Sequence, residues 1–455
     1  MGAEKDIIIA VELASTAIRA IAGKREPDGS MQVLAFAQEE SSNTIRKGII
    51  DNIDKTTQAL SRVVGKLGDK LGVRVKSVYI GLGGQSLRSV HNRVLLQFDG
   101  LELISHKTID KMRDTNSGVV YPNAQIKEVV PQEYTMGSRS IVDPVGMQAE
   151  MLEANFINII ARTTLEENIR KCVAAAGLEV QEVLISPLCL ASAILTPNEK
   201  RSGCVLVDIG ADTTTVVVYL NNILRHLCVI PLGGSNVTSD ITSLKVEAEE
   251  AEALKKKYGT AYRSDSEDKT GQKVSLSFDR TEDEEKLQEI VEARYEEIIA
   301  NVNHHIEPYR EKILSGITVT GGAARIPDLT IAFSKHASGT DLNVHLAKGL
   351  PDSINVGYGV QVGEPDRLYT LYGLLLAGKE NCVSELSEDP VQKTFDFGKP
   401  DTPDTPDTPD TPDIPDTPDT PAEPEKPKKP SAFGRIWKTF ERMLSDEVEP
   451  GDDNE

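Results

Sequence analysis

The chain has 455 residues, which is too long for one small hydrophobic core and favours two or more domains. Hydrophobic residues make up 39% of the sequence and charged residues 27%, as in ordinary soluble globular proteins. The formal net charge of −21 argues against a general nucleic-acid-binding protein, because a phosphate backbone would repel the chain.

The cysteine pattern favours a reducing, cytoplasmic environment. No Cys-x-x-Cys pair is present and most cysteines lie in apolar runs, so buried reduced thiols are expected. The early apolar run at 7–10 is broken by Glu12, which is typical of a strand and not of a signal peptide. No stretch has the roughly 18–20 apolar residues that span a bilayer. The five cysteines are Cys172, Cys189, Cys204, Cys228 and Cys382.

Hydrophobic periodicity predicts an α/β arrangement in the first part of the chain. The predicted elements are a hairpin over 6–22, a helix over 51–71 and a strand over 77–81. Glycines at 81–84 mark a boundary. Residues 84–162 then hold several strand-like runs around one helix near Ile109–Arg113, and are predicted to form a separate small subdomain.

The second half continues to alternate helices and strands. Helices and strands from 244 to 310, together with the polar loop Ser264–Lys273, are predicted to form a second inserted subdomain, and the globular part is expected to end near Lys379. The predicted elements are helices over 165–176, 187–195, 244–258, 282–310 and 369–377, and a strand over 274–278.

Three short segments have patterns that fit nucleotide binding. In Ile9–Arg19 and again in Val205–Tyr219, an apolar run ends in an acid and is followed by small or hydroxylated residues and a second β-rich run. Backbone N–H groups and hydroxyls at such a turn bind an anion, and the acid holds water around a divalent metal. In Ile317–Ile326, a strand runs into two glycines, where backbone can lie flat against a ligand.

A repetitive tail follows the globular part. Asp401 to Pro421 comprises seven triplets, six Asp-Thr-Pro and one Asp-Ile-Pro, without a basic residue. Proline at every third position excludes a helix or a central strand, and the aspartates repel one another. The segment is therefore predicted to be a disordered, extended spacer that reaches roughly 65 Å at ~3.1 Å per residue.

A short amphipathic helix is predicted beyond the spacer. Six basic and two acidic residues between Glu425 and Leu444 give this end a local positive charge. A helix of about twelve residues is ~18 Å long, too short to span a bilayer but suited to lie in the interface of anionic lipids. Docking on a partner or on the protein's own core is the alternative. The candidate membrane residues are Phe433, Arg435, Ile436, Trp437, Lys438, Phe440 and Leu444.

In order and spacing, the three segments resemble the phosphate 1, phosphate 2 and adenosine segments of the actin/Hsp70/sugar-kinase superfamily. This resemblance implies two similar α/β domains that face each other, with ATP and Mg²⁺ in the cleft. It implies that Glu12 and Asp208 hold the metal through water. The nucleotide-binding residues that it implies are Glu12, Ser15, Thr16, Arg19, Asp208, Gly210, Thr213, Glu252, Lys255, Gly321 and Gly322.

The sequence departs from the superfamily pattern at both phosphate turns. Ala14 and Ala211 replace usual glycines, and Asp212 is expected to point away from phosphate. Glu252 and Lys255 could alternatively be an ordinary surface ion pair. Active ATPases of the superfamily carry a carboxylate or glutamine before phosphate 2 to orient water, and Ile185–Leu195 has neither. ATP binding with slow or absent hydrolysis is therefore expected.

Four further motifs make the chain similar to the bacterial FtsA family of cell-division proteins. They are Val130–Tyr134, Pro231–Asp240, Glu292–Glu297 and Leu371–Leu375. The resemblance covers about residues 6–380 and the terminal helix. It implies an actin-like two-domain ATPase fold with one small subdomain relocated. The expected parts are 1–83 and 163–196 (subdomain 1A), 84–162 (1C), 197–243 and 311–380 (2A), 244–310 (2B), 381–430 (linker), 431–445 (membrane-targeting helix) and 446–455 (acidic tail).

The family resemblance also implies a function. A self-polymerising, ATP-binding protein would tether FtsZ filaments to the inner face of the cytoplasmic membrane at the division site, as a peripheral membrane protein. The implied partners are the C-terminal peptide of FtsZ, with Arg294 as its contact, further copies of the chain, anionic lipids and other division proteins, but no nucleic acid.

Three alternatives share the implied fold. A scaffold like the type IV pilus assembly ATPase is disfavoured by the terminal helix after a long spacer. An actin-fold small-molecule kinase needs a substrate pocket and a catalytic aspartate, and the sequence offers no convincing one. An Hsp70-like chaperone needs a β-rich peptide-binding domain, and none follows residue 380.

Overall fold

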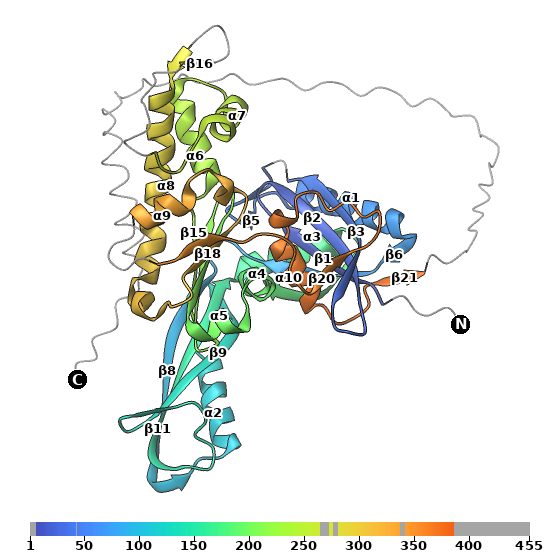
Figure 1. The fold of residues 1–455 in the computed structure, drawn as a ribbon. Helices are drawn as coiled ribbons and strands as arrows, with labels where there is room; N and C mark the ends of the chain where they lie inside the picture. Colours follow the sequence, from blue (N-terminus) through green and yellow to red (C-terminus); the bar gives the residue numbers. More distant parts are fainter. Residues whose placement is uncertain (1–5, 42, 264–272, 276–280, 337–341, 386–455) are drawn as a thin grey trace, which may run out of the picture. The chain divides into compact units, whose positions relative to one another are not determined.

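The computed structural model describes residues 6–41, 43–263, 273–275, 281–336 and 342–385 (Figure 1). The predicted Asp-Thr-Pro spacer and the predicted membrane-targeting helix lie outside these residues, as does most of the predicted polar loop at 264–273. Within the described part, the helices are too short or too polar to cross a membrane.

The first of two large sheets has six strands in the order β12-β7-β1-β2-β3-β20. Strands β1, β2 and β3 form an antiparallel meander, and β7 runs parallel to β1. The predicted hairpin over 6–22 is β1–β2, with Glu12 opposite Arg19. The strands are β1 (Ile8–Leu13), β2 (Ala17–Arg25), β3 (Met31–Glu40), β7 (Ser77–Leu82), β12 (Glu179–Ile185) and β20 (Ile354–Val356).

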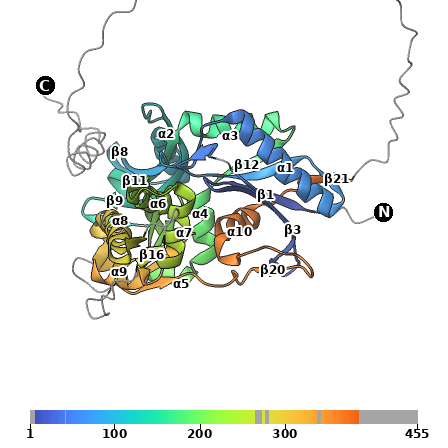
Figure 2. The same cartoon turned by 90° about the horizontal axis from the view of Figure 1, so that it is seen from above.

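Helices cover both faces of this sheet, with α1 and α3 on one side and α10 on the other (Figure 2). The first helix shows why the sequence folds locally as predicted. The Asn52 side chain accepts a hydrogen bond from the Lys55 N–H at its start, and Gly72 ends it with φ of 65°. The helices are α1 (Ile53–Leu71), α3 (Thr163–Ala175), α4 (Ser186–Ile194) and α10 (Tyr369–Ala377).

The second sheet has nine strands in the order β10-β9-β11-β8-β15-β14-β13-β18-β19. Its β13–β14–β15 meander, with β18 parallel to β13, repeats the arrangement of β1, β2, β3 and β7. The core therefore consists of two similar α/β halves, as the superfamily resemblance implies. The strands of this half are β13 (Cys204–Ile209), β14 (Thr214–Leu220), β15 (Ile223–Ile230), β18 (Ile317–Thr320) and β19 (Val344–Leu346).

Residues 84–162 have a small core of their own, which includes Ile104, Met112 and Phe156. They also continue the second sheet, because β8 pairs with β15 at Arg88 and Cys228. Sequence periodicity predicts the strands and the helix but not this join, since register between distant strands has no local signal. The elements are β8 (Arg88–Leu103), α2 (His106–Ser117), β9 (Ala124–Met136), β10 (Arg139–Ile141) and β11 (Gln148–Arg162).

Four of the remaining helices pack beside the second sheet and share its core, whereas α5 contacts β13 and β14 without a buried residue. The helix predicted at 244–258 begins at Ala248, because a 3-10 turn at Thr242–Leu244 ends at Lys245 with φ of 61°. The helix predicted at 282–310 ends at Ile306 and continues as a 3-10 turn containing Pro308. The helices are α5 (Pro197–Ser202), α6 (Gly234–Ile241), α7 (Ala248–Tyr258), α8 (Glu284–Ile306) and α9 (Leu329–Lys335).

The described chain extends slightly beyond the expected end of the globular part. Cys382 is buried, and its N–H donates to the Ile7 carbonyl. This contact brings β21 against β6 and so adds a strand at the start of the expected linker. All five cysteines are buried and free, as predicted. The short pairs are β4 (Ile45–Arg46) with β5 (Ile49–Ile50), β6 (Val73–Val75) with β21 (Val383–Glu385), and β16 (Lys273–Ser275) with β17 (Thr281–Asp283).

Gly373 sets the close packing of α10 on α4, and its replacement is expected to destabilise the fold. A Cβ at Gly373 would lie 2.1 Å from the Cys189 carbonyl oxygen. We expect Gly373→Ala to lower the free energy of unfolding by about 1–3 kcal/mol, because the backbones must separate. Gly65→Ala on α1 is the matched control: its Cβ meets nothing within 4 Å, and the change should stabilise the helix by about 0.5–1 kcal/mol. Urea unfolding that moved both variants in the same direction would contradict this account.

Candidate functional site

All eleven residues predicted to bind nucleotide line one cavity of about 700 Å³. They come from the β1–β2 and β13–β14 turns with the strands beside them, from α7, and from the residues directly after β18. The two halves of the core thus contribute equivalent turns to the same cavity. Segments that are about 200 and 300 residues apart in the chain are brought together by the repeated strand topology.

The first turn joins β1 to β2 and carries Ser15 and Thr16. The Ala14 N–H donates to the Ala17 carbonyl at 3.1 Å, so the turn closes with alanine in place of the usual glycine. At its base, Arg19 Nη1 lies 3.1 Å from Glu12 Oε2, and both side chains are largely buried. This ion pair places one carboxylate and one guanidinium group at the cavity wall.

The second turn joins β13 to β14. The Gly210 N–H donates to the Thr213 carbonyl at 2.8 Å, which closes the turn. Burial, together with the negative charge of Glu12, raises the pKa of Asp208 to about 7. Two carboxyl groups that face one cavity are suited to share a hydrated divalent cation. Glu12 and Asp208 therefore fit the predicted Mg²⁺ site.

The Asp212 carboxylate contacts the β4–β5 connection of the first half of the core. Its Oδ2 accepts a hydrogen bond of 3.0 Å from the backbone N–H of Lys47, which lies in the tight β4–β5 connection. The residue also lines the cavity. The sequence predicts that this carboxylate points away from phosphate, and its partner Lys47 precedes the cavity-lining residue Gly48.

Helix α6 begins directly against the second turn. The Gly234 N–H donates to the Gly210 carbonyl at 3.0 Å, and the Ser235 N–H donates to the Ala211 carbonyl at 2.7 Å. A Cβ at Gly233 would lie 2.6 Å from the Ala211 oxygen, so the close approach needs glycine. The Gly-Gly dipeptide of the Pro231–Asp240 motif therefore serves to seat α6 on the turn.

Glu252 and Lys255 are built into the cavity wall, unlike an ordinary surface ion pair. Lys255 Nζ lies 2.9 Å from the Gly234 carbonyl and 2.8 Å from the Thr238 hydroxyl. Glu252 Oε2 accepts from both Lys255 and Thr238 at 2.5 Å. Burial alone would raise the pKa of Glu252, but these hydrogen bonds lower it. The pair is therefore charged and fixed to α6.

The glycine pair after β18 lies beside Asp208. Gly321 has φ of 101°, and a Cβ there would lie 2.3 Å from the Ile209 carbonyl oxygen and 2.4 Å from Asp208 Oδ1. Gly322 differs, because a Cβ there would meet nothing within 4 Å. Gly321 thus serves the protein's own packing, whereas Gly322 leaves open space on the cavity side.

The cavity also contains residues that the sequence does not reveal. Arg325 and Arg367 line it, and both form ion pairs with Glu364. Ser186, at the start of α4, forms another part of the wall. Arg325 lies inside the Ile317–Ile326 segment and Ser186 inside Ile185–Leu195, but neither residue is distinguished by its sequence pattern. Arg367 lies in a segment without a recognisable motif, so only the tertiary structure assigns it to the site.

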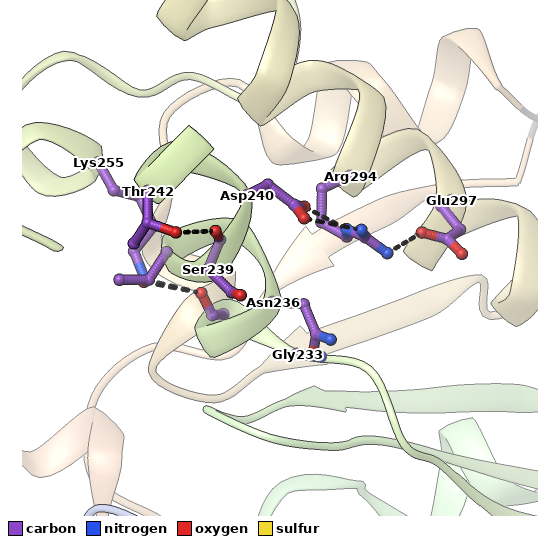
Figure 3. Close-up of polar contacts among 10 residues, drawn as sticks. Gly233, Asn236, Ser239, Asp240, Thr242, Lys255, Arg294 and Glu297 are labelled. Atoms are coloured by element: carbon purple, nitrogen blue, oxygen red, sulfur yellow. Dashed lines mark hydrogen bonds and ion pairs between the residues drawn. The ribbon is translucent and has the colours of Figure 1, made fainter. Parts of the chain in front are cut away.

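Arg294, the predicted partner contact, lies on α8 and is not among the residues that line the cavity. Its Nε is 2.6 Å from Asp240 Oδ2, and Glu297 flanks it on the other side (Figure 3). Asp240 is near the C-terminal end of α6, whose N-terminal end lies at the phosphate turn. One short helix therefore contacts both the cavity and the surroundings of Arg294.

The chain matches known protein families in two regions. Residues 205–390 match the family model of the cell division protein FtsA, and residues 84–160 match that of the SHS2 domain inserted in FtsA. The FtsA of Enterococcus hirae is 31% identical over 337 residues, which cover 71% of this chain and 75% of the relative. The FtsA of Pseudomonas aeruginosa is 29% identical over 328 residues, covering 70% and 78%.

Similarity to solved structures concerns the fold. A chain of the PilM-PilN type IV pilus biogenesis complex superposes with a TM-score of 0.58 at 14% sequence identity, covering 81% of this chain and 97% of that one.

The FtsA of Escherichia coli K12 is 26% identical over 400 residues and extends the sequence match to 85% of this chain and 93% of the relative. The chain therefore belongs to the FtsA family of cell division proteins and has an actin-like fold.

Proposed function

We propose that this protein binds ATP with Mg²⁺ in the 700 Å³ cavity and, as a polymer, tethers FtsZ filaments to the inner face of the cytoplasmic membrane at the division site. The observation that carries this proposal is the convergence of both phosphate turns and the glycine pair on one cavity in a chain of the FtsA family.

In this proposal, different walls of the cavity would bind different parts of the nucleotide. Ser15, Thr16, Gly210 and Thr213 would surround the phosphates, with Arg19 nearby. Mg²⁺, when bound, would neutralise phosphate charge, and Glu12 and Asp208 would hold its water ligands. Adenosine would lie against the open backbone of Gly321–Gly322. The fixed Glu252–Lys255 pair would bind the ribose or base from α7.

We further propose that hydrolysis is slow. The wall next to the phosphate turn is formed by the start of α4, where Ser186, Pro187 and Leu190 line the cavity. Fast phosphoryl transfer to water needs a group that orients the attacking water, and Ile185–Leu195 contains no carboxylate or glutamine. Bound ATP would then act mainly as a structural ligand that favours the polymer.

Membrane attachment would depend on assembly. A single short amphipathic helix binds a membrane weakly and reversibly. A polymer presents many such helices at once, so its overall affinity rises through avidity without new contacts. ATP would therefore control attachment indirectly, through polymerisation and the segment around Trp437.

The direct test of the nucleotide site is calorimetric titration of the full chain with ATP, with and without Mg²⁺. We expect one ATP per chain and weaker binding when Mg²⁺ is removed. Failure of ATP to bind under both conditions would contradict the proposal. A metabolite kinase would instead turn over ATP quickly when its small-molecule substrate is supplied, which separates that alternative from a structural ATP-binding protein.

The proposed FtsZ contact predicts that Arg294→Gln weakens binding of the FtsZ C-terminal peptide. Loss of one charge-assisted hydrogen bond of about 1.5–3 kcal/mol corresponds to roughly a tenfold to hundredfold lower affinity. Fluorescence anisotropy with a labelled peptide measures it. Lys286→Gln is the matched control, because Lys286 is an exposed cation on the same helix. Equal affinity of the Arg294 variant and the intact protein would rule out this contact.

A further inference from the structure

Two histidines and a cysteine meet away from the nucleotide cavity. His226 and Cys228 lie two residues apart on β15, so their side chains point to the same face of the sheet. His305 comes from the last turn of α8. His226 Nε2 and His305 Nδ1 form a hydrogen bond of 3.2 Å, and Cys228 Sγ and one ring nitrogen of each histidine lie within 4.8 Å of one another. None of the three residues lines the nucleotide cavity.

The spacing of the two nitrogens fits a shared metal ion. Two imidazole nitrogens bound to one tetrahedral Zn²⁺ at 2.0–2.1 Å are held roughly 3.3 Å apart. The observed 3.2 Å is therefore close to the spacing of a chelate, and only ring rotations are needed to turn both lone pairs towards one point. A sulfur and a nitrogen bound to one tetrahedral Zn²⁺ are about 3.6 Å apart, so the Cys228 sulfur needs to approach by up to about 1.2 Å.

The chemistry of the donor set selects the kind of ion. Imidazole nitrogen with thiolate sulfur favours Zn²⁺ and similar transition-metal ions, whereas Mg²⁺ and Ca²⁺ require oxygen ligands. We propose that His226, Cys228 and His305 bind one zinc-class divalent transition-metal ion, with the fourth position taken by water. This site is separate in place and in ligand type from the proposed Mg²⁺ site at Glu12 and Asp208.

The surroundings support a cation at this place. The C-terminal end of a helix carries partial negative charge from its last carbonyl groups, and His305 lies in the last turn of α8. A second cavity, of about 820 Å³, is lined by His91, Arg225 and Tyr309, and the Tyr309 ring is 6.1 Å from that of His226. Tyr309 thus places this cavity next to the cluster, although none of the three cluster residues lines it.

The protonation states define the binding step. Burial, with three neighbouring histidines, lowers the pKa of His226 to about 4, so its ring is neutral at pH 7. Burial raises the pKa of the Cys228 thiol to about 12. Binding therefore replaces the thiol proton: Cys–SH and M²⁺ give a metal–thiolate bond and one released H⁺. No oxidation or reduction takes part.

A bound ion would add a metal-mediated link between elements that already meet through packing and through the His226–His305 hydrogen bond. It would connect the C-terminal end of α8 to β15, and Cys228 is also the residue where β15 pairs with β8 of the 84–162 insert. The ion would thus strengthen the junction of the insert, the second sheet and α8, which runs beside that sheet (Figure 1).

Cobalt titration of the full, chelator-treated chain tests the site. We expect one Co²⁺ per chain with a thiolate-to-cobalt charge-transfer band in the near ultraviolet. Co²⁺ bound by the carboxylates of the nucleotide cavity cannot give this band. Cys228→Ser should abolish it, and His305→Gln should weaken Co²⁺ binding about tenfold or more. Cys204→Ser, a buried thiol on β13, and His106→Gln, an exposed histidine on α2, should leave it unchanged.

A second measurement guards against misfolded variants. Zn²⁺ should raise the thermal unfolding midpoint of the intact protein and of Cys204→Ser, but not that of Cys228→Ser or His305→Gln. Absence of the charge-transfer band in the intact protein, or its persistence in Cys228→Ser, would overturn the proposal. Retained Mg²⁺-dependent ATP binding in those samples would show that the nucleotide proposal stands separately.

Discussion

Asp208→Asn is expected to lower the affinity for Mg²⁺·ATP by about 10–100-fold, as for other groups that hold a metal through its water ligands. Affinity for ATP without Mg²⁺ should change less, because the phosphate turn itself is kept by the Gly210–Thr213 hydrogen bond. Asparagine retains the shape of the side chain but cannot carry the negative charge that attracts the hydrated ion.

The same substitution is expected to stabilise the nucleotide-free protein at neutral and higher pH. The pKa of Asp208 is about 7 in the folded protein and 3.8 in the unfolded reference. Because folding raises the pKa of Asp208, this residue contributes to folding stability when it is protonated. Its contribution is fully present below about pH 4 and is lost as the pH rises through about 7. Each unit of pKa shift corresponds to about 1.4 kcal/mol, so the difference amounts to a few kcal/mol.

Urea unfolding without nucleotide at pH 5 and pH 8 checks this expectation. The intact protein should lose stability relative to Asp208→Asn as the pH rises, because the buried Asp208 then ionises next to the negative charge of Glu12. Asp69→Asn, at an exposed position on α1, is the control for removal of one negative charge. A constant difference between Asp208→Asn and the intact protein across this pH range would show that Asp208 is not held against Glu12 as described.

Alanine substitutions of the two adjacent glycines in the third segment are expected to have different effects, one on stability and the other on ATP binding. Gly321→Ala should destabilise the protein by about 1–3 kcal/mol, because a left-handed φ and a buried backbone clash combine at this position. Gly322→Ala should leave the unfolding free energy almost unchanged, since nothing lies within 4 Å of its Cβ. It should nevertheless weaken ATP binding, because the added methyl group occupies the surface proposed for adenosine.

Thermal unfolding without nucleotide and calorimetric ATP titration of the two variants separate these effects. The comparison is internal, since the same atoms are added at neighbouring positions. Unchanged ATP affinity of a folded Gly322→Ala protein would place adenosine elsewhere in the cavity. Normal stability of Gly321→Ala would contradict the close packing of this residue against Ile209 and Asp208.

The parts that could be predicted from sequence are those whose signal is local. The β1–β2 turn is indicated by an apolar run, an acid and hydroxylated residues, and α1 by its hydrophobic periodicity over 51–71. Nine of the eleven predicted nucleotide-binding residues come from three such segments read against a family pattern, and Glu252 and Lys255 come from the helix α7. Within each segment, the predicted residues lie within about ten positions of one another.

What could not be predicted depends on contacts between distant segments. Arg367 reaches the cavity only because the chain after α9 and β20 returns to it. The pairing of β8 with β15 requires residues 88 and 228 to meet, and no periodicity encodes that register. Lys255 could not be distinguished from a surface lysine until its contacts with Gly234 and Thr238 were seen.

Co-sedimentation of the full chain with anionic vesicles, with and without Mg²⁺·ATP, tests the account most directly, because it joins the nucleotide site to the proposed membrane role. The intact protein should pellet with the vesicles, and more of it with Mg²⁺·ATP. Asp208→Asn should lose the nucleotide effect, and Trp437→Glu should stay in the supernatant. An intact protein that remains in the supernatant with Mg²⁺·ATP present would contradict the role as an ATP-dependent membrane tether.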